Sequence, residues 1–203
     1  MKEKAIEIID LSFSYSDKAD VLKGLNITIN EGESIGIIGP NGAGKTTFFH
    51  ILCGLLKPAA GSVYIYGKES KLRKFNPNIG YVFQNPDDQL FNTTVYDDVA
   101  FGPMNLGLGA LEVEKRVQDA LGVTGCINFE KRPPHHLSGG EKRMAAIASV
   151  ISMKPKIVIY DEPASNLDMR SRRKLIDFIN SSEETKLIAS HDLEFVLETC
   201  KRT

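Results

Sequence analysis

Apolar and polar residues alternate with a period of two in residues 6–15, with one slip, and again in residues 27–29. This alternation predicts strands that bury one face. Residues 34–38 form a short and nearly continuous apolar run, which is typical of a central strand buried on both faces. Similar runs at residues 63–66 and 79–83 predict two more strands.

Helical patterns begin after residue 44. We expect one helix to start at Gly44 or Lys45 and to end before Pro58. Residues 85–109 carry prolines, glycines and aromatic residues in irregular order, and apolar residues then recur at helical spacing in residues 113–121. Beyond them, helix and strand patterns alternate at residues 138–151, 157–160, 175–179 and 186–190.

Together these elements predict an α/β fold with a mainly parallel central sheet and an N-terminal antiparallel β subdomain. We expect a single domain over residues 1–203, with its core in residues 1–84 and 138–203 and a mainly helical insertion at residues 85–137. Residues 192–203 follow the last predicted strand and are enough for a helix of three turns at most, so the C-terminal end is expected to be short or truncated.

Composition narrows the class of protein. The 203 residues are 42% hydrophobic and 25% charged, which is ordinary for a globular protein. Lys and Arg number 25 against 26 acidic residues, so we expect no broad binding to nucleic acid. Cys53, Cys126 and Cys200 are far apart and fit a reducing cytoplasm. We expect neither a signal region nor a membrane-spanning stretch, so the chain would reach a membrane only through a partner.

The most informative local pattern is a glycine-rich segment between a predicted strand and a predicted helix, which satisfies the P-loop motif. Its glycines allow main-chain N–H groups to surround phosphate oxygens, and the helix start adds partial positive charge. We expect Lys45 to reach the β- and γ-phosphates of ATP and the Thr46 hydroxyl to bind Mg²⁺. The fold class is therefore a P-loop NTPase, and its phosphate cradle consists of Gly39, Pro40, Asn41, Gly42, Ala43, Gly44, Lys45, Thr46 and Thr47.

The second motif is an acidic pair at the end of the predicted strand at residues 157–160. Asp161 and Glu162 follow that strand, at the sheet edge where α/β proteins bind their ligands. Asp161 fits the role of Mg²⁺ ligand, and Glu162 fits the role of base for an attacking water. The two motifs together predict ATP hydrolysis.

The segment Leu137-Ser138-Gly139-Gly140-Glu141 resembles the signature of ATP-binding cassette (ABC) ATPases. Ser138 fits an N-cap, and the adjacent glycines expose N–H groups to an anion. The resemblance implies that Ser138, Gly139 and Gly140 contact the ATP held by a second ABC ATPase subunit, in a homodimer or a heterodimer.

Other motifs of this family occur in the expected order along nearly the whole chain. Tyr15 resembles the aromatic residue that stacks on adenine, although an ordinary edge-strand tyrosine is the alternative. Gln84 matches the glutamine that contacts Mg²⁺ and the attacking water, and Asp168 lies in a loop that resembles the one facing the opposite subunit. His191 matches the histidine that contacts the γ-phosphate.

Residues 84–103 closely resemble the ATPase components of energy-coupling factor transporters, which import vitamins and the metal ions cobalt and nickel. The resemblance implies an ATPase on the cytoplasmic face of the cell membrane, peripheral to transmembrane transporter subunits. Leu90, Phe91 and Phe101 are candidate anchors for a partner helix, and a role in the core of the insertion is the alternative.

Rival functions remain open from the residues alone. A soluble ABC ATPase acting on DNA or ribosomes is the main alternative, although residues 85–137 are too few for a long coiled coil. A P-loop kinase or GTPase would need neither the signature nor His191. Glu162 and His191 also argue against a catalytically inactive module. His135 and His136 are adjacent and lack a nearby cysteine or carboxylate, so we do not expect them to form a zinc site.

Overall fold

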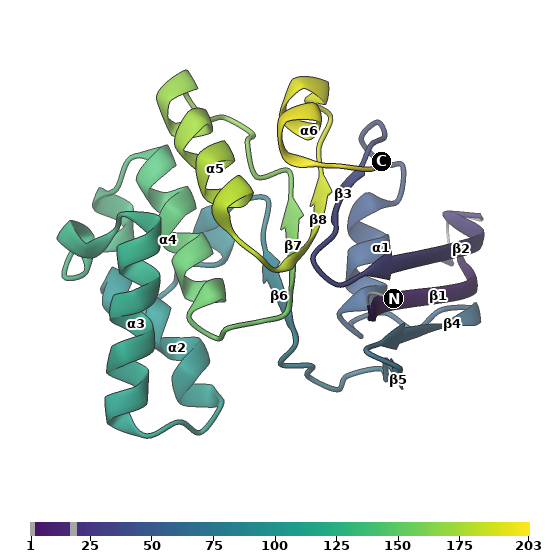
Figure 1. The fold of residues 1–203 in the computed structure, drawn as a ribbon, viewed down its shortest axis with the longest axis horizontal. Coiled ribbons are helices and arrows are strands. Elements are labelled where there is room, and N and C mark those ends of the chain that lie inside the picture. The colour runs from purple at the N-terminus through teal and green to yellow at the C-terminus, as the bar shows by residue number, and fades with distance from the viewer. Residues whose placement is uncertain (1–2, 17–19) are drawn as a thin grey trace.

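The computed structural model describes residues 3–16 and 20–203, so the first two residues of the expected domain lie outside the described part. Two sheets lie side by side, with most of the helices at the end of the molecule away from the antiparallel sheet (Figure 1). The antiparallel sheet has the order β2-β1-β4-β5, with bounds Leu22–Asn30, Lys4–Phe13, Ala60–Ile65 and Lys68–Glu69. The parallel sheet has the order β3-β8-β7-β6, with bounds Ser34–Ile37, Thr185–Ala189, Ile157–Asp161 and Ile79–Val82.

The helices cover both faces of the parallel sheet. Helix α1 (Lys45–Leu52) lies between the two sheets and buries Phe49 and Leu52 in a core shared with β1 and β7. On the opposite face, α4 (Gly139–Ile151), α5 (Met169–Ser181) and α6 (Leu193–Thr199) pack against β7 and β8. The strands β7 and β8 are buried along their whole length, which explains the apolar runs at residues 157–160 and 187–189, although β8 begins with the buried polar residues Thr185 and Lys186.

The segment between β6 and α4 folds around its own apolar cluster. It contains α2 (Val95–Asn105) and α3 (Ala110–Thr124), with 3₁₀ turns at Pro86–Asp88, Ile127–Phe129 and Pro134–His136. Residues from α2, α3 and α4 form this cluster. The arrangement fits the predicted helical insertion, whose limits at residues 85 and 137 stay a prediction.

The predicted boundaries need correction at several places. Strand β1 ends at Phe13, so Tyr15 lies in the following loop and is not a strand residue. Part of the irregular segment 85–109 forms α2, which contains Pro103. Strand β4 starts three residues before the expected position 63, because residues 60–65 pair with β1.

The C-terminal residues return to the parallel sheet. Helix α6 has seven residues, and beyond it the Gly36 N–H donates to the main-chain carbonyl of Arg202 at 2.7 Å. This contact fixes the end of the described chain beside β3. Among the described residues, no helix is long and apolar enough to cross a membrane.

Candidate active site

The loop between β3 and α1 has a backbone that requires glycine at two places. Gly42 has φ +79° and Gly44 has φ +94°, in the left-handed region that other residues rarely adopt. A Cβ on Gly44 would also lie 3.1 Å from the main-chain oxygen of Val21. Gly44 directly precedes α1, so the loop brings main-chain groups to the start of a helix, which is the arrangement that binds phosphate.

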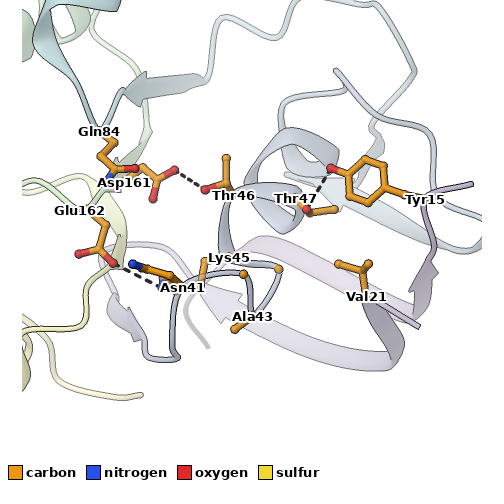
Figure 2. A pocket seen from close by; sticks show the side chains of 12 residues that line it. Tyr15, Val21, Asn41, Ala43, Lys45, Thr46, Thr47, Gln84, Asp161 and Glu162 are labelled. Carbon is orange, nitrogen blue, oxygen red and sulfur yellow. Dashed lines mark hydrogen bonds and ion pairs between the residues drawn. The ribbon is translucent and has the colours of Figure 1, made fainter. Parts of the chain in front are cut away.

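The Lys45 ammonium group is held at the centre of this loop. It donates to the main-chain carbonyl of Gly39 at 2.7 Å and to that of Pro40 at 3.3 Å. Its Nζ lies 3.4 Å from Glu162 Oε1, and both side chains are almost completely buried. Figure 2 shows Lys45 and Glu162 converging from opposite sides of the hollow. A cation held this close to the loop is placed to compensate negative charge there.

Asp161 ends β7 and is joined to two hydroxyl groups. The Thr46 hydroxyl and the Tyr81 hydroxyl each donate to Asp161 Oδ2 at 2.8 Å. Burial of Tyr81, together with the charge of Asp161, raises the pKa of its phenol well above the usual range, so the phenol stays a donor. Asp161 itself is 3% exposed. The sequence did not reveal Tyr81, whose partner is 80 positions away.

Glu162 adopts a strained backbone conformation. Its φ is 48°, which is uncommon for a residue other than glycine, and such strain concentrates at functional sites. The main-chain N–H of Glu162 donates to the Ala189 carbonyl at 2.9 Å, so β8 holds it in place. Its Oε2 lies 2.8 Å from His191 Nδ1, and the His191 ring is 65% exposed. His191 therefore contacts Glu162 on one side and remains accessible on the other.

These residues surround one hollow of about 390 Å³, shown in Figure 2. The Tyr15 hydroxyl shares a hydrogen bond of 3.1 Å with Thr47 Oγ1 at its wall. Val21, which the sequence did not indicate, also lines it. The predicted site residues that line the hollow are Tyr15, Asn41, Gly42, Ala43, Gly44, Lys45, Thr46, Thr47, Gln84, Asp161 and Glu162. Gly39, Pro40 and His191 adjoin it through their contacts with Lys45 and Glu162.

The predicted signature lies elsewhere. Ser138 caps α4 in a reciprocal capping box with Glu141, whose carboxylate accepts the Ser138 N–H at 2.8 Å. Ser138 and Gly140 line a second groove of about 880 Å³ together with Asp168. Asp168 caps α5 by accepting the Ser171 N–H at 2.9 Å. Neither Ser138, Gly139, Gly140 nor Asp168 lines the hollow at the P-loop.

The three candidate anchors for a partner helix differ in exposure. Leu90 is 7% exposed and packs in the helical cluster, which corresponds to the alternative role in the core of the insertion. Phe91 is 64% exposed and Phe101 is 49% exposed, and their rings meet edge-to-face at 5.0 Å between centroids. The structure therefore leaves two of the three aromatic or aliphatic candidates on the surface.

Comparison with known proteins places the chain in a family. The family model for the ABC transporter matches residues 22–165. The energy-coupling factor transporter ATP-binding protein EcfA of Methanothermobacter thermautotrophicus is 49% identical over 205 residues, which cover 97% of this chain and 66% of that protein. EcfA of Methanocaldococcus jannaschii is 46% identical over 199 residues, covering 94% of this chain and 71% of that protein.

A solved structure agrees with these relatives. The structure of cbiO1 from Clostridium perfringens, described as part of the ABC transporter complex cbiONQ, is 37% identical and has a TM-score of 0.89. The match covers 98% of this chain and 83% of that one. The chain thus spans 66 to 83% of the length of these three proteins. The family and the fold class predicted from the sequence are confirmed, and the chain belongs to the ABC transporter family as an ATP-hydrolysing component similar to energy-coupling factor ATPases.

Proposed function

We propose that this chain powers the import of a small solute, a metal ion or a vitamin, by hydrolysing ATP in a paired arrangement with a second ABC ATPase. Residues 39–47 would hold the phosphates, and Tyr15 would stack on adenine. Glu162 would accept a proton from the attacking water, while Gln84 orients that water and His191 contacts the γ-phosphate. The buried position of Glu162 between Lys45 and His191 supports this assignment.

The observation that carries the proposal is the separation of the two ATP-binding motifs within one chain. The P-loop and the acidic pair share one hollow, whereas Ser138, Gly140 and Asp168 line another. The first turn of α4 has main-chain N–H groups without an intrahelical partner, which suit an anion, and Ser138 and Gly140 do not line the hollow at the P-loop of their own chain. A second subunit that brings its P-loop to this face would complete both sites, with Gly139 and Gly140 allowing close approach.

The residues around Asp161 fit a bound Mg²⁺ ion. The Thr46 hydroxyl and the Asp161 carboxylate lie 2.8 Å apart, and Gln84 lines the same hollow. All three side chains supply oxygen atoms, the ligand type that Mg²⁺ prefers. We propose that Thr46, Asp161 and Gln84 hold the ion, whose chemistry in such sites is to neutralise charge on the phosphate oxygens.

A membrane partner has a candidate docking surface near Gln84. An apolar hollow of about 450 Å³ is lined by residues that include Phe75 and Phe83. Met153 also lines it and lies against Gly102, the neighbour of the exposed Phe101, so the hollow adjoins the Phe91–Phe101 pair. We propose that a helix of a transmembrane subunit occupies this surface, because the similar cbiO1 is described as part of a transporter complex. The chain would then work at the cytoplasmic face of the membrane.

The alternative of a soluble ABC ATPase acting on DNA or ribosomes has less support. Such a DNA-acting protein needs a long coiled coil in the insertion, and the longest helix described between β6 and α4 is α3 with 15 residues. The formal net charge of −1 also gives no general attraction to nucleic acid.

The proposed function is tested by capture and uptake. A tagged chain is purified from membranes, its partners are identified, and the complex is reconstituted in vesicles. ATP-dependent uptake of radioactive Co²⁺, Ni²⁺ and riboflavin is then measured with the wild type and with Glu162→Gln. We expect a membrane protein to be captured, and uptake of one probe to be lost in the variant. Capture of ribosomes or DNA without a membrane protein would contradict the proposal.

The paired site has a separate test. Ser138→Arg places a bulky cation at the start of α4, far from the Lys45 cradle of the same chain. ATP binding should persist, whereas hydrolysis should fall, because the second half of each composite site is blocked. Hydrolysis at the wild-type rate in this variant would show that the signature is not part of the ATP site.

A further inference from the structure

Arg143 lies in the second turn of α4 and contacts the segment that carries Gln84. Its Nη1 donates to the main-chain carbonyl of Phe83, and its Nη2 donates to that of Gln84, both at 2.7 Å. The residue is 2% exposed. Gln84 lines the nucleotide hollow two residues after β6 ends, so the guanidinium group fixes the backbone at the point where the chain leaves the sheet and enters the site.

The charge of Arg143 is buried without a carboxylate. No ion pair of Arg143 occurs among residues 3–16 and 20–203, and its Nε is buried without a hydrogen-bond partner. Burial lowers the pKa of the guanidinium to about 10, so it remains protonated at neutral pH. An apolar side chain would fill the same space without the desolvation penalty of a cation. The retained charge therefore serves the two short hydrogen bonds to the Gln84 segment.

Other contacts join the same helix to the same segment. The Gln89 amide donates to the Ala146 carbonyl at 2.6 Å and to Ser149 Oγ at 2.9 Å, and its oxygen accepts the Phe83 N–H. Lys142 and Asp87 form an ion pair of 2.6 Å nearer the surface. Residues 83–89 are thus attached to α4 along two turns, and α4 begins at Ser138.

We infer that Arg143 is a positioning residue that fixes Gln84 to the helix bearing the Ser138 signature. The inference rests on the proposed paired function, in which Gln84 serves the ATP of its own subunit and Ser138 serves the ATP of the other. Through Arg143, a displacement of Gln84 at one site is transmitted to the helix that carries the signature of the other site. The residue therefore couples the two ATP sites of the pair.

The test compares Arg143→Met, Arg143→Lys and the matched control Lys142→Met in the full chain with its partner subunits. ATP affinity is measured with a fluorescent ATP analogue, and kcat and the Hill coefficient for ATP are measured in the same preparations. Arg143→Met should bind the analogue within about twofold of the wild type, because the Lys45 cradle is untouched. Its kcat should fall by about tenfold or more, since misplacement of a positioned group by 1 Å costs up to about 100-fold. Its Hill coefficient should fall to one.

The other variants separate positioning from packing. Arg143→Lys keeps a buried cation but lacks the planar guanidinium group that donates to two carbonyls at once. Its kcat should therefore lie between the values of wild type and Arg143→Met. If Arg143→Met does not fold, Arg143→Lys alone tests whether Arg143 positions Gln84. Lys142→Met removes only the partly exposed ion pair, so its kcat and Hill coefficient should match the wild type.

Two results would overturn different statements. A cooperative wild type with unchanged kcat and Hill coefficient in Arg143→Met and Arg143→Lys would overturn the role of Arg143, even if the variants unfold at a lower temperature. Hydrolysis at the wild-type rate in Ser138→Arg would contradict the paired function itself.

Discussion

Gly140 and Gly139 are adjacent in the signature, yet the structure predicts different effects on stability for their replacement by alanine. A Cβ on Gly140 would lie 2.2 Å from Ser171 Oγ and 2.7 Å from Ser171 Cβ, closer than real carbon contacts allow. A Cβ on Gly139 would meet no heavy atom within 4 Å. Ser171 cannot simply rotate away, because its Cβ also clashes and its hydroxyl donates to Asp168 Oδ2 at 2.8 Å.

The magnitude follows from two terms. Overpacking of this kind typically costs about 1–3 kcal/mol. Replacement of glycine by alanine in a helix returns up to about 1 kcal/mol, and this gain applies to both variants because both residues lie in the first turn of α4. The helix term therefore cancels in the difference, and Gly140→Ala should be less stable than Gly139→Ala by about 1–3 kcal/mol.

The measurement is urea unfolding followed by far-ultraviolet circular dichroism, since the chain contains no Trp. Ser171→Gly removes both clashing atoms but keeps the N–H that Asp168 accepts. The double variant Gly140→Ala/Ser171→Gly should therefore recover most of the loss, giving a coupling energy of about 1–3 kcal/mol in a double-mutant cycle. Equal stability of Gly140→Ala and Gly139→Ala, or strict additivity in the cycle, would refute the predicted contact between the signature and α5.

Three further outcomes are expected. Tyr81→Phe removes one hydrogen-bond donor to Asp161, so half-maximal nucleotide binding should need about tenfold more Mg²⁺. Nucleotide binding without Mg²⁺ should stay unchanged, and fluorescence titration measures both quantities. The hydrogen bond from the Ser138 N–H lowers the pKa of Glu141 below its usual value of 4.5. The capping box therefore stabilises the fold above pH 4.5, and this stabilisation is lost as the pH falls through the lowered pKa of Glu141 in the folded state. Glu141→Gln should remove this part of the pH dependence of urea unfolding. Replacement of both Phe91 and Phe101 by serine should abolish capture of the membrane partner with little change in the unfolding midpoint, because Phe91 is 64% exposed and Phe101 is half-exposed. Unchanged capture would contradict the docking surface.

The parts of the fold that the sequence predicted best are those with a local signal. Strand β7 is buried throughout, and its first four residues form a continuous apolar run. Strand β8 is also buried throughout, but only residues 187–189 carry the apolar signal. The two-residue strand β5 has no such run, because its pairing with β4 is a tertiary contact. Helix α2 escaped prediction because Pro103 and the neighbouring Gly102 are poor helix formers, and tertiary packing of α2 outweighs their propensity.

The candidate site divides in the same way. The P-loop is a contiguous motif, and Asp161 follows a recognisable strand, so both were predicted from spacing alone. Tyr81 and Arg143 act on partners 80 and about 60 residues away, and a single sequence contains no signal for such contacts. The role of Leu90 stayed open between partner anchor and core, because its apolar character fits a core and an interface equally well.

The most direct test of the proposed hydrolytic site is single-turnover ATP hydrolysis by Glu162→Gln, with ATP binding measured in the same samples. The variant should bind ATP as the wild type does, because the contacts of Lys45 with the Gly39 and Pro40 carbonyls remain. Its hydrolysis should fall by about 100-fold or more, the typical contribution of a general base. Hydrolysis at the wild-type rate with ATP fully bound would show that Glu162 is not the base.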